Sequence, residues 1–183
     1  MSGVISSPYF KILLVAVVAF IIIVIVGSLI GGGKANLSKQ IATLKMQVDG
    51  TMMVISDYQP SLKSSDLRSS SSSLYGVLSI TSSDLQNYLQ EKYDSSEKEY
   101  KNLQEEADLE KDALEADLFN AKINGTLDRI YAHKMTYQIS AIMTKETNIY
   151  NASGDETLKS LLETSYNSLN NLYEKFSNFS ETK

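Results

Sequence analysis

The feature that most constrains this chain is an uninterrupted apolar run near its N-terminus, from Ile12 to Ile30. The run has no charged residue, and Ser28 is its only polar side chain. A helical rise of about 1.5 Å per residue makes it roughly 28 Å long, close to the hydrocarbon thickness of a bilayer. We therefore expect a transmembrane anchor at 12–30, a short tail at 1–11 and a glycine-rich exit at 31–36.

A cleaved signal peptide is the main alternative to a permanent anchor, but its apolar core is shorter, about 7–15 residues. We therefore expect an uncleaved single-pass anchor whose first partner is the lipid bilayer. Gly27 and Gly31 form a GxxxG, with Ser28 and Gly32 offset by one. These four residues fit either a helix–helix contact in the membrane or a glycine-rich exit from the bilayer, because they lie at the end of the run.

Membrane orientation follows from charge and domain length. Lys34, Lys39 and Lys45 on the C-terminal side outnumber Lys11 on the N-terminal side, which taken alone favours a cytoplasmic domain. Long domains translocate largely regardless of charge, however, and a short N-terminal tail usually stays inside. We expect a single-pass protein of the plasma membrane, with its N-terminus inside and an extracytoplasmic C-terminal domain.

Beyond the anchor, apolar residues recur at gaps of three and four, which indicates helices, and no segment alternates with the period of a strand. The sequence predicts an all-α fold: the transmembrane helix, then an antiparallel up-and-down bundle over 37–180 with four to five long helices. Their expected ranges are about 35–58, 61–93, 96–123, 126–150 and 154–179. Two segments have coiled-coil-like seams: Leu67, Ser71, Leu74, Leu78, Thr81, Leu85 and Tyr88; and Leu158, Leu162, Ser165, Leu169, Leu172, Phe176 and Phe179.

Local signals mark the helix ends. Pro60 ends the first helix of the bundle, and Gly125 suits the left-handed geometry of a helix C-terminus. Ser153 with Glu156 matches a capping box. The serine run 69–73 has two interpretations, a flexible break or a continuous helix whose small residues admit a close neighbour.

The acidity of the chain is concentrated in one segment. Residues 94–117 hold ten acidic residues and three lysines, a net charge of −7, whereas the whole chain carries −5. We expect the helix in this segment to be peripheral, with a thin apolar face formed by Tyr100, Leu103, Ala107, Leu114, Leu118 and Ala121. Its charges form either a solvated face or a docking face for a basic partner. The docking face would comprise Glu105, Asp108, Asp112 and Glu115.

The residue types argue against catalysis and metal binding. The chain has no cysteine and a single histidine, His133, which lacks the Glu-x-x-His spacing of a di-iron bundle. No calcium-loop pattern or nucleophile–base arrangement is recognisable. An acidic chain does not suit nucleic acid. We expect no enzyme activity, no metal and no cofactor.

Two functions fit these features. The first is a structural, scaffolding or protein-interaction role at the membrane surface, through a protein partner or a homo-oligomer. The alternative is an extracytoplasmic ligand-binding or sensory bundle that acts through a partner. In that case a small-molecule pocket lined by tyrosines such as Tyr75, Tyr131 and Tyr137 is expected.

Overall fold

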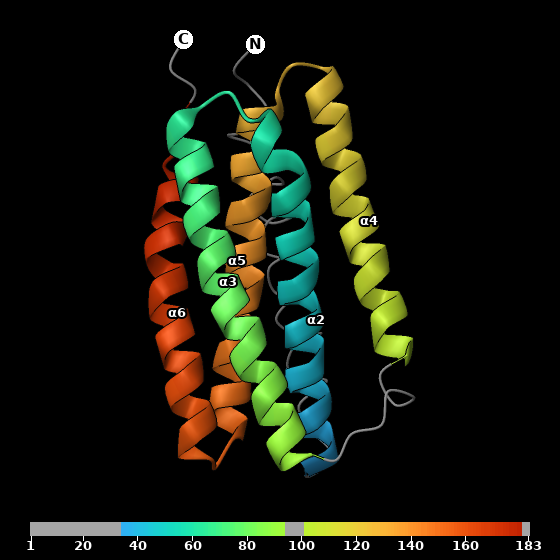
Figure 1. Cartoon of the computed structure of the whole chain (residues 1–183), viewed down its shortest axis with the longest axis vertical. Coiled ribbons are helices and arrows are strands. Elements are labelled where there is room, and N and C mark those ends of the chain that lie inside the picture. The colour runs from blue at the N-terminus through green and yellow to red at the C-terminus, as the bar shows by residue number, and fades with distance from the viewer. Residues whose placement is uncertain (1–33, 94–100, 181–183) are drawn as a thin grey trace, which may run out of the picture. The chain divides into compact units, whose positions relative to one another are not determined.

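The computed structural model describes residues 34–93 and 101–180, and within these ranges the chain is helical with no strand. The all-helical prediction is therefore confirmed for this part of the chain. Successive helices run in opposite directions (Figure 1). The elements are α2 (Lys34–Tyr58), the 3-10 turn η1 (Gln59–Ser61), α3 (Ser65–Lys92), α4 (Lys101–Ile123), α5 (Leu127–Ala152) and α6 (Glu156–Ser177).

None of the helices in 34–93 and 101–180 combines the length and the apolar character needed to cross a bilayer. The predicted tail at 1–11 and the anchor at 12–30 lie outside the described residues, as do Gly27, Ser28, Gly31 and Gly32. The predicted exit at 31–36 is only partly described. Its last three residues, 34–36, belong to α2, so this part of the predicted exit is helical.

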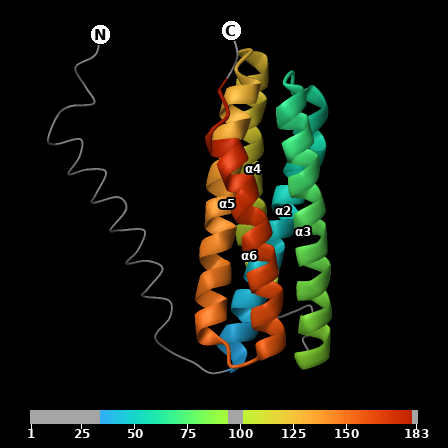
Figure 2. The same cartoon turned by 90° about the vertical axis from the view of Figure 1, so that its left-hand side faces the viewer.

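The core is formed by the apolar faces of α2, α3, α5 and α6, and the inner face of α4 adds Leu103, Leu114, Leu118 and Ala121 to it. The residues from Leu37 onward make one compact unit. All seven predicted seam residues of α3 are buried, including the polar Ser71 and Thr81, and so are six of the seven on α6. Helices α5 and α6 lie side by side (Figure 2). Burying a leucine or phenylalanine stabilises by roughly 2 kcal/mol, so these seams supply much of the folding free energy.

Helix α3 is continuous through the serine run 69–73, which resolves the two interpretations in favour of a helix. It begins at Ser65, four residues later than expected. The delay has a clear cause: residues 59–61 form the turn η1, and Ser64 caps the helix by accepting a hydrogen bond from the Leu67 N–H.

The Asp128 carboxylate, on the first turn of α5, reinforces the start of α3. Its two oxygens accept hydrogen bonds from the backbone N–H groups of Lys63 (3.0 Å) and Ser64 (2.7 Å). Asp128 is buried. A carboxylate from a distant part of the sequence therefore satisfies two donors that would otherwise be unpaired at the entry to α3.

The turn from α4 to α5 follows the sequence prediction. Gly125 has φ of +70°. The Thr126 N–H bonds the Ala121 carbonyl at 2.9 Å, and the Gly125 N–H bonds that of Lys122 at 3.2 Å. This pair of bonds closes the C-terminus of α4 in the geometry that glycine adopts without a steric cost.

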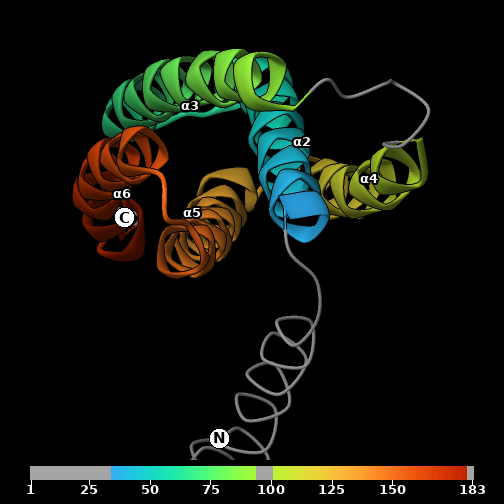
Figure 3. The ribbon, with the colours of Figure 1, turned by 90° about the horizontal axis from the view of Figure 1, so that it is seen from below.

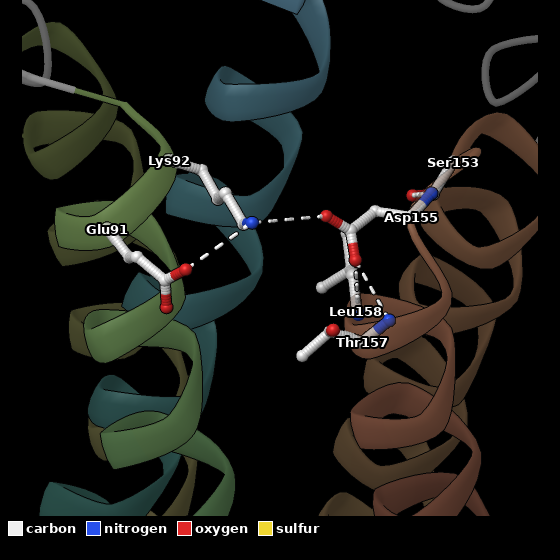
Figure 4. A network of polar contacts seen from close by, with 6 residues as sticks. All are labelled: Glu91, Lys92, Ser153, Asp155, Thr157 and Leu158. Carbon is white, nitrogen blue, oxygen red and sulfur yellow. Dashed lines mark hydrogen bonds and ion pairs between the residues drawn. The ribbon is translucent and has the colours of Figure 1, made fainter.

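The capping box predicted for Ser153 and Glu156 is wrong. Helix α5 continues to Ala152, so Ser153 lies at its C-terminus, and Asp155 caps α6 instead (Figure 4). The Asp155 carboxylate accepts hydrogen bonds from the N–H groups of Thr157 (2.8 Å) and Leu158 (3.3 Å). Burial alone would raise the pKa of Asp155, but these N–H groups and nearby Lys92 hold that pKa below its ordinary value.

Candidate functional site

Helix α4 lies at the edge of the bundle. Seen along the helices, it sits beyond α2 and away from α6 (Figure 3). Its inner face buries Leu103, Leu114 and Leu118. Polar contacts fix its position: the Tyr58 hydroxyl of α2 donates to the Glu115 carbonyl at 2.9 Å, and Lys134 of α5 pairs with Asp117 at 2.5 Å. The opposite side of α4 is exposed.

The four acidic residues predicted as a docking face do not have equivalent surroundings. Glu105, Asp108 and Asp112 are exposed, whereas Glu115 is half-buried beside α2. Lys111 pairs with both Asp112 (3.1 Å) and Glu115 (3.3 Å), which neutralises part of their charge. Within the described residues, Glu105 and Asp108 have no ion pair, so the outward charge of the quartet rests mainly on these two.

A second apolar surface follows the exposed side of α4. Leu109, Phe119 and Ile123 are 72%, 56% and 67% exposed. With Ala113 and Ala116 they fall within about one third of the helix circumference, opposite the inner face, at 100° per residue. We call these five residues the outer stripe. The outer stripe was not predicted from the sequence, although the spacing i, i+7, i+14 of Leu109, Ala116 and Ile123 is a signal for it.

One carboxyl group lies inside the core. Glu146 of α5 is 1% exposed, and neither of its oxygens accepts a hydrogen bond. Burial raises its pKa to about 7, and the Ser165 hydroxyl offsets part of the rise. Glu146 is therefore largely uncharged at slightly acidic pH. The sequence held a signal for it, since Ile142 and Ile149 lie seven residues apart on one helix face and Glu146 occupies the inward position between them.

Two buried hydroxyl groups lie beside Glu146. Thr81 of α3 donates to the Val77 carbonyl at 3.0 Å. The Thr81 and Ser165 oxygens are 2.8 Å apart and share a hydrogen bond across the seam between α3 and α6. The surroundings of the Glu146 carboxyl group are therefore apolar side chains and these two hydroxyls.

A shallow groove of about 190 Å³ runs between α5 and α6 on the outside of the bundle. No charged residue lines it. Its lining is Ser140, Met143, Thr144, Thr147, Tyr166, Asn170 and Tyr173. The tyrosines expected in a pocket are elsewhere: Tyr131 is in the core against Phe176, with ring centroids 6.3 Å apart, and Tyr75 and Tyr137 are exposed and outside this groove.

Within the described ranges, no group of three or more His, Asp or Glu side chains is arranged to hold a metal ion. His133 is exposed on α5. Comparison of the chain with protein-family models, with curated proteins and with solved structures found no match.

Proposed function

We propose that this protein is a single-pass, membrane-anchored helical bundle with a scaffolding or protein-interaction role at the membrane surface. The observation that carries the proposal is the exposed acidic side of α4. Helix α4 buries its inner face in the core and leaves its opposite side exposed to a partner. The apolar run at 12–30 supports the anchor, because its length matches a bilayer.

The proposed location is the plasma membrane, with the bundle outside the cytoplasm. The test is to express the full-length chain with a C-terminal tag, wash the membranes with carbonate and treat intact cells with protease. We expect the chain to stay in the membrane pellet and the tag to be digested. Deletion of residues 12–30 should release the chain. A full-length chain that carbonate removes from the membrane contradicts the proposal.

The interaction role is tested by cross-linking in native membranes. The triple change Glu105→Lys, Asp108→Lys and Asp112→Lys should abolish capture of a cross-linked partner. Glu163→Lys with Glu174→Lys is the matched control, because both residues are exposed on α6. If the triple variant still captures the cross-linked partner, the acidic residues of α4 form a solvated face and not a docking face.

The groove between α5 and α6 supports a second candidate, an extracytoplasmic ligand-binding or sensory bundle that acts through a partner. Its uncharged lining of hydroxyl, amide and aromatic groups suits a neutral polar molecule. A thermal-shift screen of neutral polar compounds on the full-length chain tests this function. A hit should lose its effect on changing Tyr166→Ala and Tyr173→Ala. No shift from any compound class would remove this candidate.

A further inference from the structure

The outer stripe of α4 has no structural role that the described bundle explains. The helix already packs Leu114 and Leu118 inward, and its exposed Leu109, Phe119 and Ile123 contribute nothing to that core. From Leu109 to Ile123 the stripe extends about 21 Å along the helix. Single exposed apolar residues are common on proteins, but several gathered on one side of a helix are typical of an interaction site. Asp112 and Asn120 fall within the same arc, so this surface combines apolar and polar side chains.

Acidic residues lie within and beside the outer stripe. At 100° per residue, Glu105 and Asp112 fall within its arc and Asp108 lies about 20° beyond Phe119, and all three are exposed. In the part of the chain that the structure describes, Glu105 and Asp108 form no ion pair, so their charges are available to a partner. A second copy docked through the same stripe would place carboxylates against carboxylates, and an anionic lipid surface would be repelled.

We propose that the outer stripe binds a basic amphipathic helix of a partner protein. The apolar side of that helix covers Leu109, Phe119 and Ile123, while its lysines or arginines meet the carboxylates within and beside the stripe. This inference rests on the proposed function and names the partner of the same helix. One helix face buries little area, so the contact should be transient, with a Kd on the order of micromolar.

The probe is a synthetic peptide of about five helical turns, made of leucine and lysine with the leucines at helical spacing. A second peptide has glutamate in place of lysine, and a third has the lysine peptide's composition in scrambled order. Binding to the full-length chain in nanodiscs of zwitterionic lipid is measured by fluorescence anisotropy, with empty nanodiscs as the blank. We expect the lysine peptide alone to bind, and more weakly as salt is added.

Two sets of variants separate the apolar and charged contributions. Leu109→Gln, Phe119→Gln and Ile123→Gln together should weaken binding about tenfold or more, because they remove the apolar contact. Glu105→Lys with Asp108→Lys should weaken binding several-fold and reduce its salt dependence. The matched control is Met53→Gln, Ile80→Gln and Tyr137→Gln, side chains 56%, 65% and 63% exposed on other helices, which should leave binding unchanged.

Three results would overturn the inference: equal binding of the glutamate or the scrambled peptide, equal loss in the control triple variant, or no binding of the lysine peptide. Self-association of the protein that the outer-stripe variant abolishes would also overturn it, in favour of a second copy. Carbonate extraction of the same preparations is read separately. If the chain stays in the membrane but does not bind the lysine peptide, this inference alone is refuted. If carbonate removes the chain from the membrane, the proposed function is refuted.

Discussion

At the scale of single residues, Glu146 is the buried group with the largest expected effect on stability. Its pKa rises from an ordinary 4.5 to about 7 in the folded protein. The folded state therefore holds this proton more tightly than the unfolded state. The resulting stabilisation is complete below pH 4.5, falls by about 1.4 kcal/mol per pH unit above it, and is lost as the pH passes 7.

We therefore expect Glu146→Gln to remove most of the decline in the free energy of unfolding between pH 5 and pH 7.5. The decline should amount to about 2 kcal/mol in the natural protein. Urea unfolding followed by circular dichroism measures it. Glu163→Gln, at an exposed position of α6, is the matched control. If the Glu146→Gln profile keeps the full decline, the buried carboxyl group does not cause it.

Asp128 leads to a prediction with a different cause. Its carboxylate accepts the Lys63 and Ser64 N–H groups, so Asp128→Ala leaves two donors at the entry to α3 without that partner. Loss of hydrogen bonds to a charged group should cost about 2 kcal/mol. Asp66→Ala, an exposed acidic position in the first turn of α3, should cost far less. Equal urea midpoints for the two variants would contradict this account.

At the scale of the helices, two glycines should respond in opposite ways to alanine. Gly76 is exposed within α3, and an added Cβ would meet no atom within 4 Å. Gly76→Ala should therefore stabilise by about 1 kcal/mol, because alanine is the better helix former. Gly125 has a φ of +70°, where a side chain is strained, so Gly125→Ala should lower the thermal midpoint. A stabilising Gly125→Ala would contradict the C-terminal geometry described for α4.

The seams of α3 and α6 could be predicted from the sequence because a regular spacing of three and four is a property of the local chain. Positions fixed by distant partners could not. No local pattern around Asp128 indicates that its carboxylate accepts the Ser64 N–H, 64 residues earlier in the sequence, at the start of α3. The prediction of Ser153 as the cap of α6 was wrong because Asp155 lies two residues closer to the helix. The Asp155 carboxylate accepts two backbone N–H groups of the first turn.

The candidate site was predicted only in part. Charge counting located the acidic helix, but it could not show that Glu115 turns toward α2 while Glu105 and Asp108 remain outside. Charge counting also did not identify the outer stripe, because Leu109, Phe119 and Ile123 are separated by charged residues in the sequence. Their common surface exists only once Leu114 and Leu118 have set which side of α4 faces inward.

At the scale of the whole bundle, the helix directions make a distance prediction. The chain has no native cysteine, so pairs of introduced cysteines can be spin-labelled without background. Labels at Lys39 in α2 and Asn178 after α6 should be roughly 30 Å apart or more, the length of α6. Labels at Lys39 and Glu91 should be closer, because α3 ends where α2 begins (Figure 1). Electron double resonance measures both distances, and similar values would contradict the up-and-down order.

An odd number of antiparallel helices gives the described bundle two different ends. A chain that crosses the bundle five times enters at one end and leaves at the other, whereas four or six crossings would return it to the entry end. Leu37, near the start of α2, and Ser180 are therefore held about one helix length apart, with no linker needed to set the separation.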